Sequence, residues 1–269
     1  MKTVIEMKNI SYIRKETVIL NSVNLTVHQG EFVSIVGSNG AGKSSLIRIL
    51  LGLEKSTNGS ISIFEKSLDE NKGEILKHIG VIFENPTDTF VTNKVSDELM
   101  FSLQNMNLSN EEIQSRLNEV SNYLHIEHLL DCIPHSLSGG EKQLVSLGAA
   151  LMLQPDILVI DESLDMIDAI TKDKILALLK KIHKEKNMTV IYVTQELEDT
   201  MYTDRIILLS NGTITLDEKV KNAFHDDKIY REAGLSLPFM VELSKKLQYY
   251  DLVDKIEFNI DKLVNKLWK

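Results

Sequence analysis

The 269-residue sequence contains a single cysteine, Cys132. One thiol cannot form a disulfide within the chain, and this cysteine usage suits a reducing cytosol. The neighbouring residues Leu129, Leu130 and Ile133 are apolar. A free cysteine in such surroundings behaves as a small hydrophobic side chain. We therefore expect Cys132 to be a buried structural thiol.

The sequence also lacks a long hydrophobic run. Its most apolar long window, Leu144 to Ile160, is interrupted by Gln154, Pro155 and Asp156, whereas a membrane-spanning helix needs about 20 continuous apolar residues. The opening segment MKTVIEMKN has charged residues where a secretory signal would have its apolar core. We expect the chain to stay inside the cell and to meet a membrane only through a partner protein.

A concentrated basic surface is missing as well. The formal net charge is -9, and the Lys and Arg residues are scattered along the chain. Such a charge would repel a phosphate backbone, so nucleic acid is not an expected partner. Internal repeats and low-complexity segments are also absent from the sequence. With 43% hydrophobic and 26% charged residues, the composition is that of a globular protein with a full core.

The first half of the sequence alternates between strand and helix patterns. Residues 23–27 alternate apolar and polar side chains, and residues 32–36 form a short apolar run, so both are predicted strands. A glycine-rich loop follows, and from Lys43 the pattern is that of a helix closed by Gly52. Further strands are predicted at residues 60–64, 79–83, 157–161 and 188–194. An amphipathic helix between the last two indicates an α/β fold with a parallel sheet.

Residues 86–155 are predicted to form a mostly helical insert in this α/β domain. Ser109 and Glu112 make a capping box that opens a helix through Leu124. Farther on, the pair Asn211-Gly212 between two apolar runs predicts a hairpin.

The sheet pattern stops near Lys219, which divides the chain into residues 1–219 and a small helical appendage, residues 220–269. We expect a break and a helix cap at Asn259. Packing of the appendage against its own domain is one interpretation of its apolar stripe, and a dimerisation face is the other. The residues that recur at helical spacing are Leu252, Val253, Ile256, Ile260, Leu263, Val264 and Leu267.

Residues 37–44 fit the pattern G-x-x-x-x-G-K-[ST] between a predicted strand and a predicted helix, which is the context of a phosphate-binding loop. The glycines let backbone N–H groups surround phosphate oxygens. Lys43 would place a cation on the β- and γ-phosphates, and the Ser44 hydroxyl could ligate Mg²⁺. The residues predicted to bind nucleotide here are Gly37, Ser38, Asn39, Gly40, Ala41, Gly42, Lys43, Ser44 and Ser45.

A second element is the apolar run at residues 157–160, which ends in Asp161 and Glu162. Ligands of open α/β sheets bind at the carboxyl ends of the strands. Asp161 would hold Mg²⁺ through water, and Glu162 could polarise the attacking water. Many buried strands end in an acidic turn, so this pattern is weak by itself.

A third element, Leu137-Ser138-Gly139-Gly140-Glu141, leads into a predicted helix. Here the chain resembles the ATP-binding cassette (ABC) family, whose signature sequence begins LSGG, although S-G-G-E is also a reasonable helix cap. The resemblance implies an ABC nucleotide-binding domain with a phosphate-loop parallel-sheet core and an N-terminal antiparallel β-subdomain. It also implies that ATP and Mg²⁺ are bound and that two cassettes pair head to tail. The signature residues would then complete the ATP site of the partner, and Asp168 looks like a retained D-loop residue.

The stretch Phe83-Glu-Asn-Pro-Thr-Asp-Thr-Phe90, followed by VSDELMFSL, is similar to F-Q-N-P-D-N-Q-F of energy-coupling factor (ECF) importer ATPases. The tail segments 234–239 and 263–268 resemble the extra C-terminal domain of the first ATPase type in that group. The resemblance implies a second ATPase, a transmembrane coupling protein contacting residues 84–101, and a substrate-binding membrane protein. It also implies import of vitamins or metal ions at the cytoplasmic face of the membrane.

Three positions depart from the family pattern around the chain's own phosphate loop. Arg14 stands where an aromatic residue usually stacks on adenine, with Tyr12 as a substitute, and a guanidinium can also stack on a base. Glu84 replaces a glutamine that senses Mg²⁺ and the attacking water, and remains an oxygen ligand for metal. Gln195 replaces a histidine that contacts the γ-phosphate, and an amide cannot acquire that positive charge.

These departures leave three interpretations. The first is an importer motor that pairs with a more typical ATPase, because a homodimer would have two weakened sites; the substitutions could also be neutral drift in a working site. The second is a regulatory ATP-binding subunit with little hydrolysis, which the retained Glu162 argues against. The third is a soluble cassette protein of DNA repair or translation, which the lack of coiled-coil heptads, of a second cassette and of a basic face disfavours.

Overall fold

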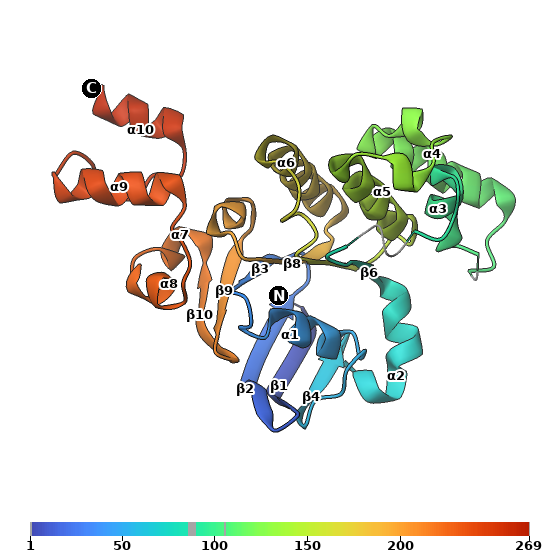
Figure 1. The fold of residues 1–269 in the computed structure, drawn as a ribbon, viewed down its shortest axis with the longest axis horizontal. Helices are drawn as coiled ribbons and strands as arrows, with labels where there is room; N and C mark the ends of the chain where they lie inside the picture. The colour runs from blue at the N-terminus through green and yellow to red at the C-terminus, as the bar shows by residue number, and fades with distance from the viewer. Residues whose placement is uncertain (1, 86–89, 105, 269) are drawn as a thin grey trace.

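The computed structural model describes residues 2–85, 90–104 and 106–268. Two β-sheets lie next to each other (Figure 1). The smaller sheet is antiparallel in each of its strand pairs. Its strand order is β2-β1-β4-β5. These strands span Thr3–Arg14 (β1), Thr17–His28 (β2), Asn58–Ile63 (β4) and Lys66–Ser67 (β5).

The larger sheet has the order β10-β9-β3-β8-β7-β6, and only β10 runs antiparallel to its neighbour. Strands β3, β7 and β8 are buried at every position, as expected for strands covered on both faces. Their carboxyl ends meet at one edge of the sheet. The strands are Phe32–Val36 (β3), Ile79–Ile82 (β6), Ile157–Asp161 (β7), Thr189–Thr194 (β8), Arg205–Ser210 (β9) and Thr213–Lys219 (β10).

Helices cover both faces of the large sheet (Figure 1). On the side of the small sheet, α1 (Lys43–Leu50) and α2 (Leu68–Ile75) join a core that includes residues of both sheets. On the opposite side lie α3 (Val95–Phe101), α4 (Asn110–Leu124), α5 (Gly139–Met152) and α6 (Ala169–Lys186). These helices share a second core with the other face of the sheet. Short 3-10 turns lie at Leu76–His78, Glu127–Leu129, Pro134–Ser136 and Leu197–Tyr202.

The C-terminal residues form helices after β10, and the last two of these helices lie farther from the sheet than the first two (Figure 1). A third apolar core joins them to the large sheet, with Phe224 and Tyr230 on the C-terminal side and Val36 and Leu197 on the other. The C-terminal segment therefore packs on its own chain, at the strand that leads into the glycine-rich loop. The helices are α7 (Val220–Ala223), α8 (Lys228–Glu232), α9 (Phe239–Tyr249) and α10 (Ile260–Leu267).

The α/β class, the parallel sheet, the N-terminal antiparallel sheet and the helical insert are confirmed. The capping box of Ser109 and Glu112 is present, and α4 ends at Leu124 as expected. Asn211 and Gly212 both have positive φ angles, 48° and 74°, in the tight turn between β9 and β10, which is the turn chemistry that such a pair favours. Within the described residues, no helix combines the length and apolar character needed to cross a membrane.

Two expectations about local structure were wrong. The helical stripe was expected from Leu252, but the chain is irregular until Asn259, whose side chain accepts a hydrogen bond from the Lys262 N–H at 3.0 Å and caps α10. Cys132 is half-buried rather than buried. Its neighbour Ile133 is 54% exposed, so the apolar residues beside the thiol in sequence do not all cover it.

Candidate functional site

The glycine-rich loop connects β3 to α1 and needs glycine for steric reasons. Gly40 and Gly42 have φ angles of 80° and 104°, where a residue with a Cβ is strained. A Cβ on Gly42 would also lie 2.9 Å from Leu20 Cδ2 and 3.0 Å from the carbonyl oxygen of Ile19. The loop is therefore held against β2, and its backbone is free to curve around a ligand.

Lys43 begins α1 and is almost completely buried. Its ammonium group donates to the carbonyl oxygens of Gly37 at 2.7 Å and Ser38 at 3.0 Å. It also forms an ion pair with Glu162 at 2.9 Å. The three donors of the ammonium are thus occupied by three protein oxygens. A phosphate that binds the Lys43 ammonium group must therefore replace at least one of these three oxygens.

Asp161 and Glu162 stand at the carboxyl end of β7, the second neighbour of β3 in the sheet. Burial, followed by the charges of Glu162 and Glu84, raises the pKa of Asp161 to about 6. The Asp161 Oδ1 atom is buried and has no hydrogen-bond partner among the described residues. Buried polar atoms normally have partners, so this oxygen is suited to bind a ligand. Because Glu84, Glu162 and Asp161 are acidic, the ligand that they would attract is a cation.

Mg²⁺ prefers carboxylate and hydroxyl oxygens and shares them with phosphate groups. The unpartnered oxygen of Asp161 and the half-buried Ser44 at the start of α1 fit this requirement. In the described part of the chain, no three or more His, Cys, Asp or Glu side chains are grouped to hold a metal ion. Glu84 is exposed at the end of β6, and its charge acts on Asp161.

Gln195 follows β8, the strand between β3 and β7. It lines a cavity of about 650 Å³ together with Ser38 and Asn39 of the glycine-rich loop. The far wall of this cavity is made by residues 234–237, between α8 and α9. The sheet order thus brings Gln195 beside the glycine-rich loop. Residues 234–237 add a wall from the C-terminal segment that sequence analysis did not predict.

The signature residues lie at the start of α5, in the helical insert. Ser138 caps the helix, and its hydroxyl donates to Glu141 at 2.6 Å while Glu141 occupies the reciprocal position of a capping box. Ser138 and Gly139 are exposed, Leu137 is half-buried, and Gly140 faces Thr171 of α6. The signature is thus an outward-facing surface, and the expected alternative of a helix cap holds at the same time.

Arg14 is exposed at the end of β1, paired with Thr17 in the hairpin. Tyr12 is half-buried and lies opposite Leu20, the residue that approaches Gly42. The hydrogen bond and negative charge of Glu54 raise the pKa of Tyr12, and the nearby positive charge of Arg14 lowers it. The structure therefore places both candidates for base stacking on the same hairpin, with Tyr12 nearer to the loop.

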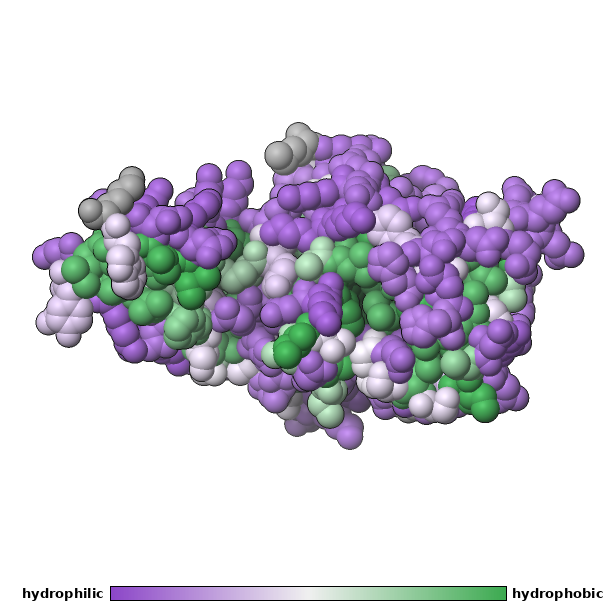
Figure 2. All heavy atoms as spheres, turned by 90° about the horizontal axis from the view of Figure 1, so that it is seen from above, coloured by the Kyte–Doolittle hydropathy of each residue, from purple (hydrophilic) through white to green (hydrophobic). Residues whose placement is uncertain are grey.

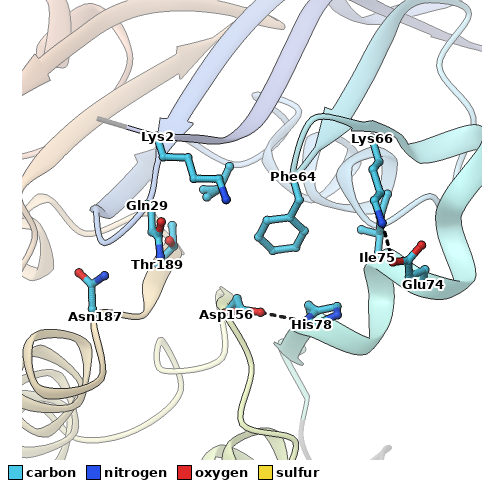
Figure 3. Close-up of a pocket in the computed structure, with 11 residues that line it drawn as sticks. Lys2, Gln29, Phe64, Lys66, Glu74, Ile75, His78, Asp156, Asn187 and Thr189 are labelled. Atoms are coloured by element: carbon cyan, nitrogen blue, oxygen red, sulfur yellow. Dashed lines mark hydrogen bonds and ion pairs between the residues drawn. The ribbon is translucent and has the colours of Figure 1, made fainter.

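Another cavity, of about 270 Å³, lies at the opposite edge of the sheet, where β6, β7 and β8 begin (Figure 3). Within it, the Lys66 ammonium group pairs with Glu74, and the Nδ1 atom of His78 lies 2.8 Å from Asp156. Phe64 packs edge-on against the His78 ring. None of the residues predicted to bind nucleotide lines this cavity, so it is separate from the site described above.

Comparison with known proteins places the fold and the site in context. Residues 20–165 match the family described as ABC transporter. The chain is 37% identical over 270 residues to energy-coupling factor transporter ATP-binding protein EcfA1 of Oenococcus oeni, covering 99% of this chain and 98% of the relative. It is 33% identical to the protein of the same name from Staphylococcus epidermidis, covering 98% of each.

Among solved structures, cbiO1 of Clostridium perfringens, described as part of the ABC transporter complex cbiONQ, is similar with a TM-score of 0.80 and 27% identity. The match covers 91% of this chain and all of that chain. The ADP conformation of an ATP-binding cassette of an ABC transporter has the same fold, with a TM-score of 0.78 at 22% identity, covering 87% of this chain and 99% of the other.

Proposed function

This chain belongs to the ABC transporter family, and we propose that it is the ATP-binding and hydrolysing motor subunit of an ECF-type importer for vitamins or metal ions. The observation that carries this proposal is the convergence of Lys43, Asp161 and Glu162 beneath the glycine-rich loop, with Lys43 and Glu162 2.9 Å apart. Phosphoryl transfer depends on such a placement of a cation, a metal ligand and a water-polarising group.

Each residue has a role in this proposal. The loop residues 37–45 bind the phosphates, and Ser44, Asp161 and Glu84 hold Mg²⁺, which neutralises phosphate charge when it is bound. Glu162 polarises the attacking water. The signature residues Leu137–Glu141, of which Ser138 and Gly139 are exposed, complete the site of a second ABC ATPase.

The chain's own nucleotide site is proposed to be degenerate. Gln195 can donate a hydrogen bond to the γ-phosphate, but it cannot carry the charge of a protonated histidine. Loss of one transition-state contact typically costs about 10²- to 10³-fold in rate. Glu84 adds a negative charge near the phosphates, and Arg14 lies exposed on the hairpin. In a heterodimer with a more typical ATPase, the partner's phosphate loop forms one competent site, and the intact signature of this chain completes that site.

The membrane partner is proposed to bind a groove between β6 and the helical insert. This groove of about 270 Å³ is lined largely by apolar residues, including Phe83 and Phe90 at one end and Phe101 on α3. Phe83 and Phe101 are 38% and 46% exposed, and the nearby Val91 is 64% exposed. A helix of a transmembrane coupling protein fits this surface, and the substrate-binding membrane protein joins the complex through it, at the cytoplasmic face of the membrane.

The division into an ABC domain, residues 1–219, and a C-terminal domain, residues 220–269, is part of the proposal. Hydrophobic side chains gather at the end of the molecule formed by α9 and α10 (Figure 2), and exposed fractions are 63% for Phe239 and 56% for Ile260. Large exposed apolar patches mark interaction surfaces. This surface suits the contact with the second ATPase.

A second candidate is a regulatory ATP-binding subunit that hydrolyses ATP weakly or not at all. The replacement at Gln195, at the mouth of the loop, favours it. Hydrolysis by the wild type, Glu162→Gln and Gln195→His, each alone and mixed with the typical ATPase encoded alongside, separates the candidates.

We expect the wild type to be nearly silent alone and to support hydrolysis by the partner, and Gln195→His to raise the rate of the chain's own site. Fast hydrolysis by the wild type alone, with no effect of Gln195→His, would show a conventional motor whose substitutions are tolerated. Failure of the mixture to exceed the partner alone would contradict the motor role.

A further inference from the structure

A buried cluster of charged side chains lies behind Gln195. Lys172 of α6 is 5% exposed, and its ammonium group is 3.0 Å from Glu196, 3.3 Å from Asp199 and 3.8 Å from Asp165. The three carboxylates come from two segments that follow β7 and β8. Lys172 therefore ties α6 to both segments that leave the sheet at the nucleotide edge.

Thr194, the last residue of β8, extends this cluster to the backbone. Its hydroxyl lies 3.0 Å from Asp199 and 3.3 Å from Asp165, and it accepts a hydrogen bond from the Glu196 N–H at 3.0 Å. The Tyr192 hydroxyl donates to Asp199 at 2.7 Å. The residues on both sides of Gln195 are thus fixed by the cluster, while Gln195 itself lines the cavity at the glycine-rich loop.

The charge balance of the cluster depends on Lys172. Within the described residues, it is the one cation paired with these three carboxylates, and Asp199 is as buried as Lys172. Burial raises the pKa of Asp165 to about 6, and the charge of Lys172 opposes this rise. Burial also raises the pKa of Asp199, against the effect of Tyr192 and Lys172. Without the ammonium group, the carboxylates would repel one another across the turn that carries Gln195.

We propose that Lys172 is a positioning residue of the nucleotide site: by holding Glu196, Asp199 and Asp165 together, it keeps the Gln195 amide directed at the terminal phosphate of ATP. This inference rests on the proposed function, because it needs a nucleoside triphosphate in the loop. The expected consequence is selective. Lys172 should affect the preference for a triphosphate over a diphosphate and leave ADP binding itself nearly unchanged.

The test measures the dissociation constants of ADP and of a non-hydrolysable ATP analogue, both with Mg²⁺, by titration calorimetry on the full-length protein. A hydrogen bond to a charged phosphate is consistent with roughly a tenfold preference for the triphosphate. Gln195→Ala should remove this preference. Lys172→Met should reduce it about fivefold to tenfold with less than about a twofold change for ADP, and Lys172→Arg should retain most of it.

A double variant tests whether Lys172 acts through Gln195. Combining Lys172→Met with Gln195→Ala should reduce the preference no further than Gln195→Ala alone, because coupled residues are non-additive. Multiplying effects, or a folded Lys172→Met with an unchanged preference, would overturn the inference. So would a wild-type preference that Gln195→Ala leaves intact.

Glu196→Gln provides a second route if Lys172→Met does not fold, because the Glu196 side chain is 55% exposed and its replacement leaves no buried charge unpaired. It should lower the preference about threefold, in line with the loss of one charged contact. An unchanged preference in this variant would also contradict the inference. A wild type that binds neither nucleotide would instead refute the proposed function.

Discussion

Replacement of Glu162 by glutamine is expected to tighten ADP binding in the absence of metal. In the structure, the Glu162 carboxylate forms an ion pair with the Lys43 ammonium group at 2.9 Å. The side chain of Glu162 is only 12% exposed and that of Lys43 only 4%. ADP must take over this cation with its β-phosphate. The ion pair therefore competes with the nucleotide, and a neutral amide at the same place competes less.

The magnitude follows from the bonds that Lys43 makes. Two of its three contacts, to the carbonyl oxygens of Gly37 and Ser38, are unaffected by the substitution. The third changes from a charged acceptor, worth about 1.5–3 kcal/mol, to a neutral one worth about 1 kcal/mol. A difference of about 1.4 kcal/mol corresponds to a tenfold lower dissociation constant for ADP.

The assay is titration of each variant with ADP in the presence of a chelator, which excludes hydrolysis and metal binding from the comparison. Glu111→Gln is the matched control, because it removes the same charge from an exposed residue of α4 that has no role in the proposed nucleotide site. We expect less than about a twofold change for this control. Equal effects of both substitutions, or weaker ADP binding by Glu162→Gln, would refute the competition between Glu162 and phosphate.

Two further predictions concern the signature helix and the acidic strand end. Ser138→Ala and Ser109→Ala remove equivalent capping boxes from α5 and α4, so each should lower the free energy of unfolding by about 1 kcal/mol. Only Ser138→Ala should also abolish hydrolysis by the partner ATPase. Equal effects of the two substitutions on the partner would contradict a role of the signature in trans. Asp161→Asn should raise the free energy of unfolding by about 2–3 kcal/mol at pH 7.5, because the pKa of Asp161 is raised from 3.8 to about 6 in the folded protein and each pKa unit corresponds to about 1.36 kcal/mol. Between pH 4 and 6, Asp161 is still protonated in the folded chain but has lost its proton in the unfolded chain, so the stability of the wild type falls as pH rises through this window. Denaturant unfolding at pH 4 should therefore show almost no gain in stability from Asp161→Asn.

Local sequence patterns predicted the elements whose causes are local. The capping box of Ser109 and Glu112 involves residues three apart and begins α4 where expected. The apolar run before Asp161 forms β7 with the predicted bounds, because an apolar strand of this length is stable only inside a sheet. The glycine-rich loop likewise carries its own conformational requirement in Gly40 and Gly42.

Other features depend on contacts between distant residues and could not be predicted in this way. The irregular segment before Asn259 keeps helical spacing in its sequence, but Ile256 and Phe258 pack on the third core and the Glu257 backbone bonds to the Ser244 hydroxyl of α9. The cluster around Lys172 joins residues up to 34 positions apart, from Asp165 to Asp199, and only the positions of Glu196 and Thr194 near Gln195 offered a signal for it.

The sequence by itself determined the α/β class and the glycine-rich loop between a strand and a helix, because each depends on residue types at short spacing, and the resemblance to the ABC family added the departure at Gln195. Only the tertiary structure decided which side chains share the site. It paired Lys43 with Glu162, left an Asp161 oxygen without a partner, and placed Lys172 behind Gln195. The physical reason is the strand order β3-β8-β7, which brings the ends of non-consecutive strands together through crossovers that short-range patterns do not specify.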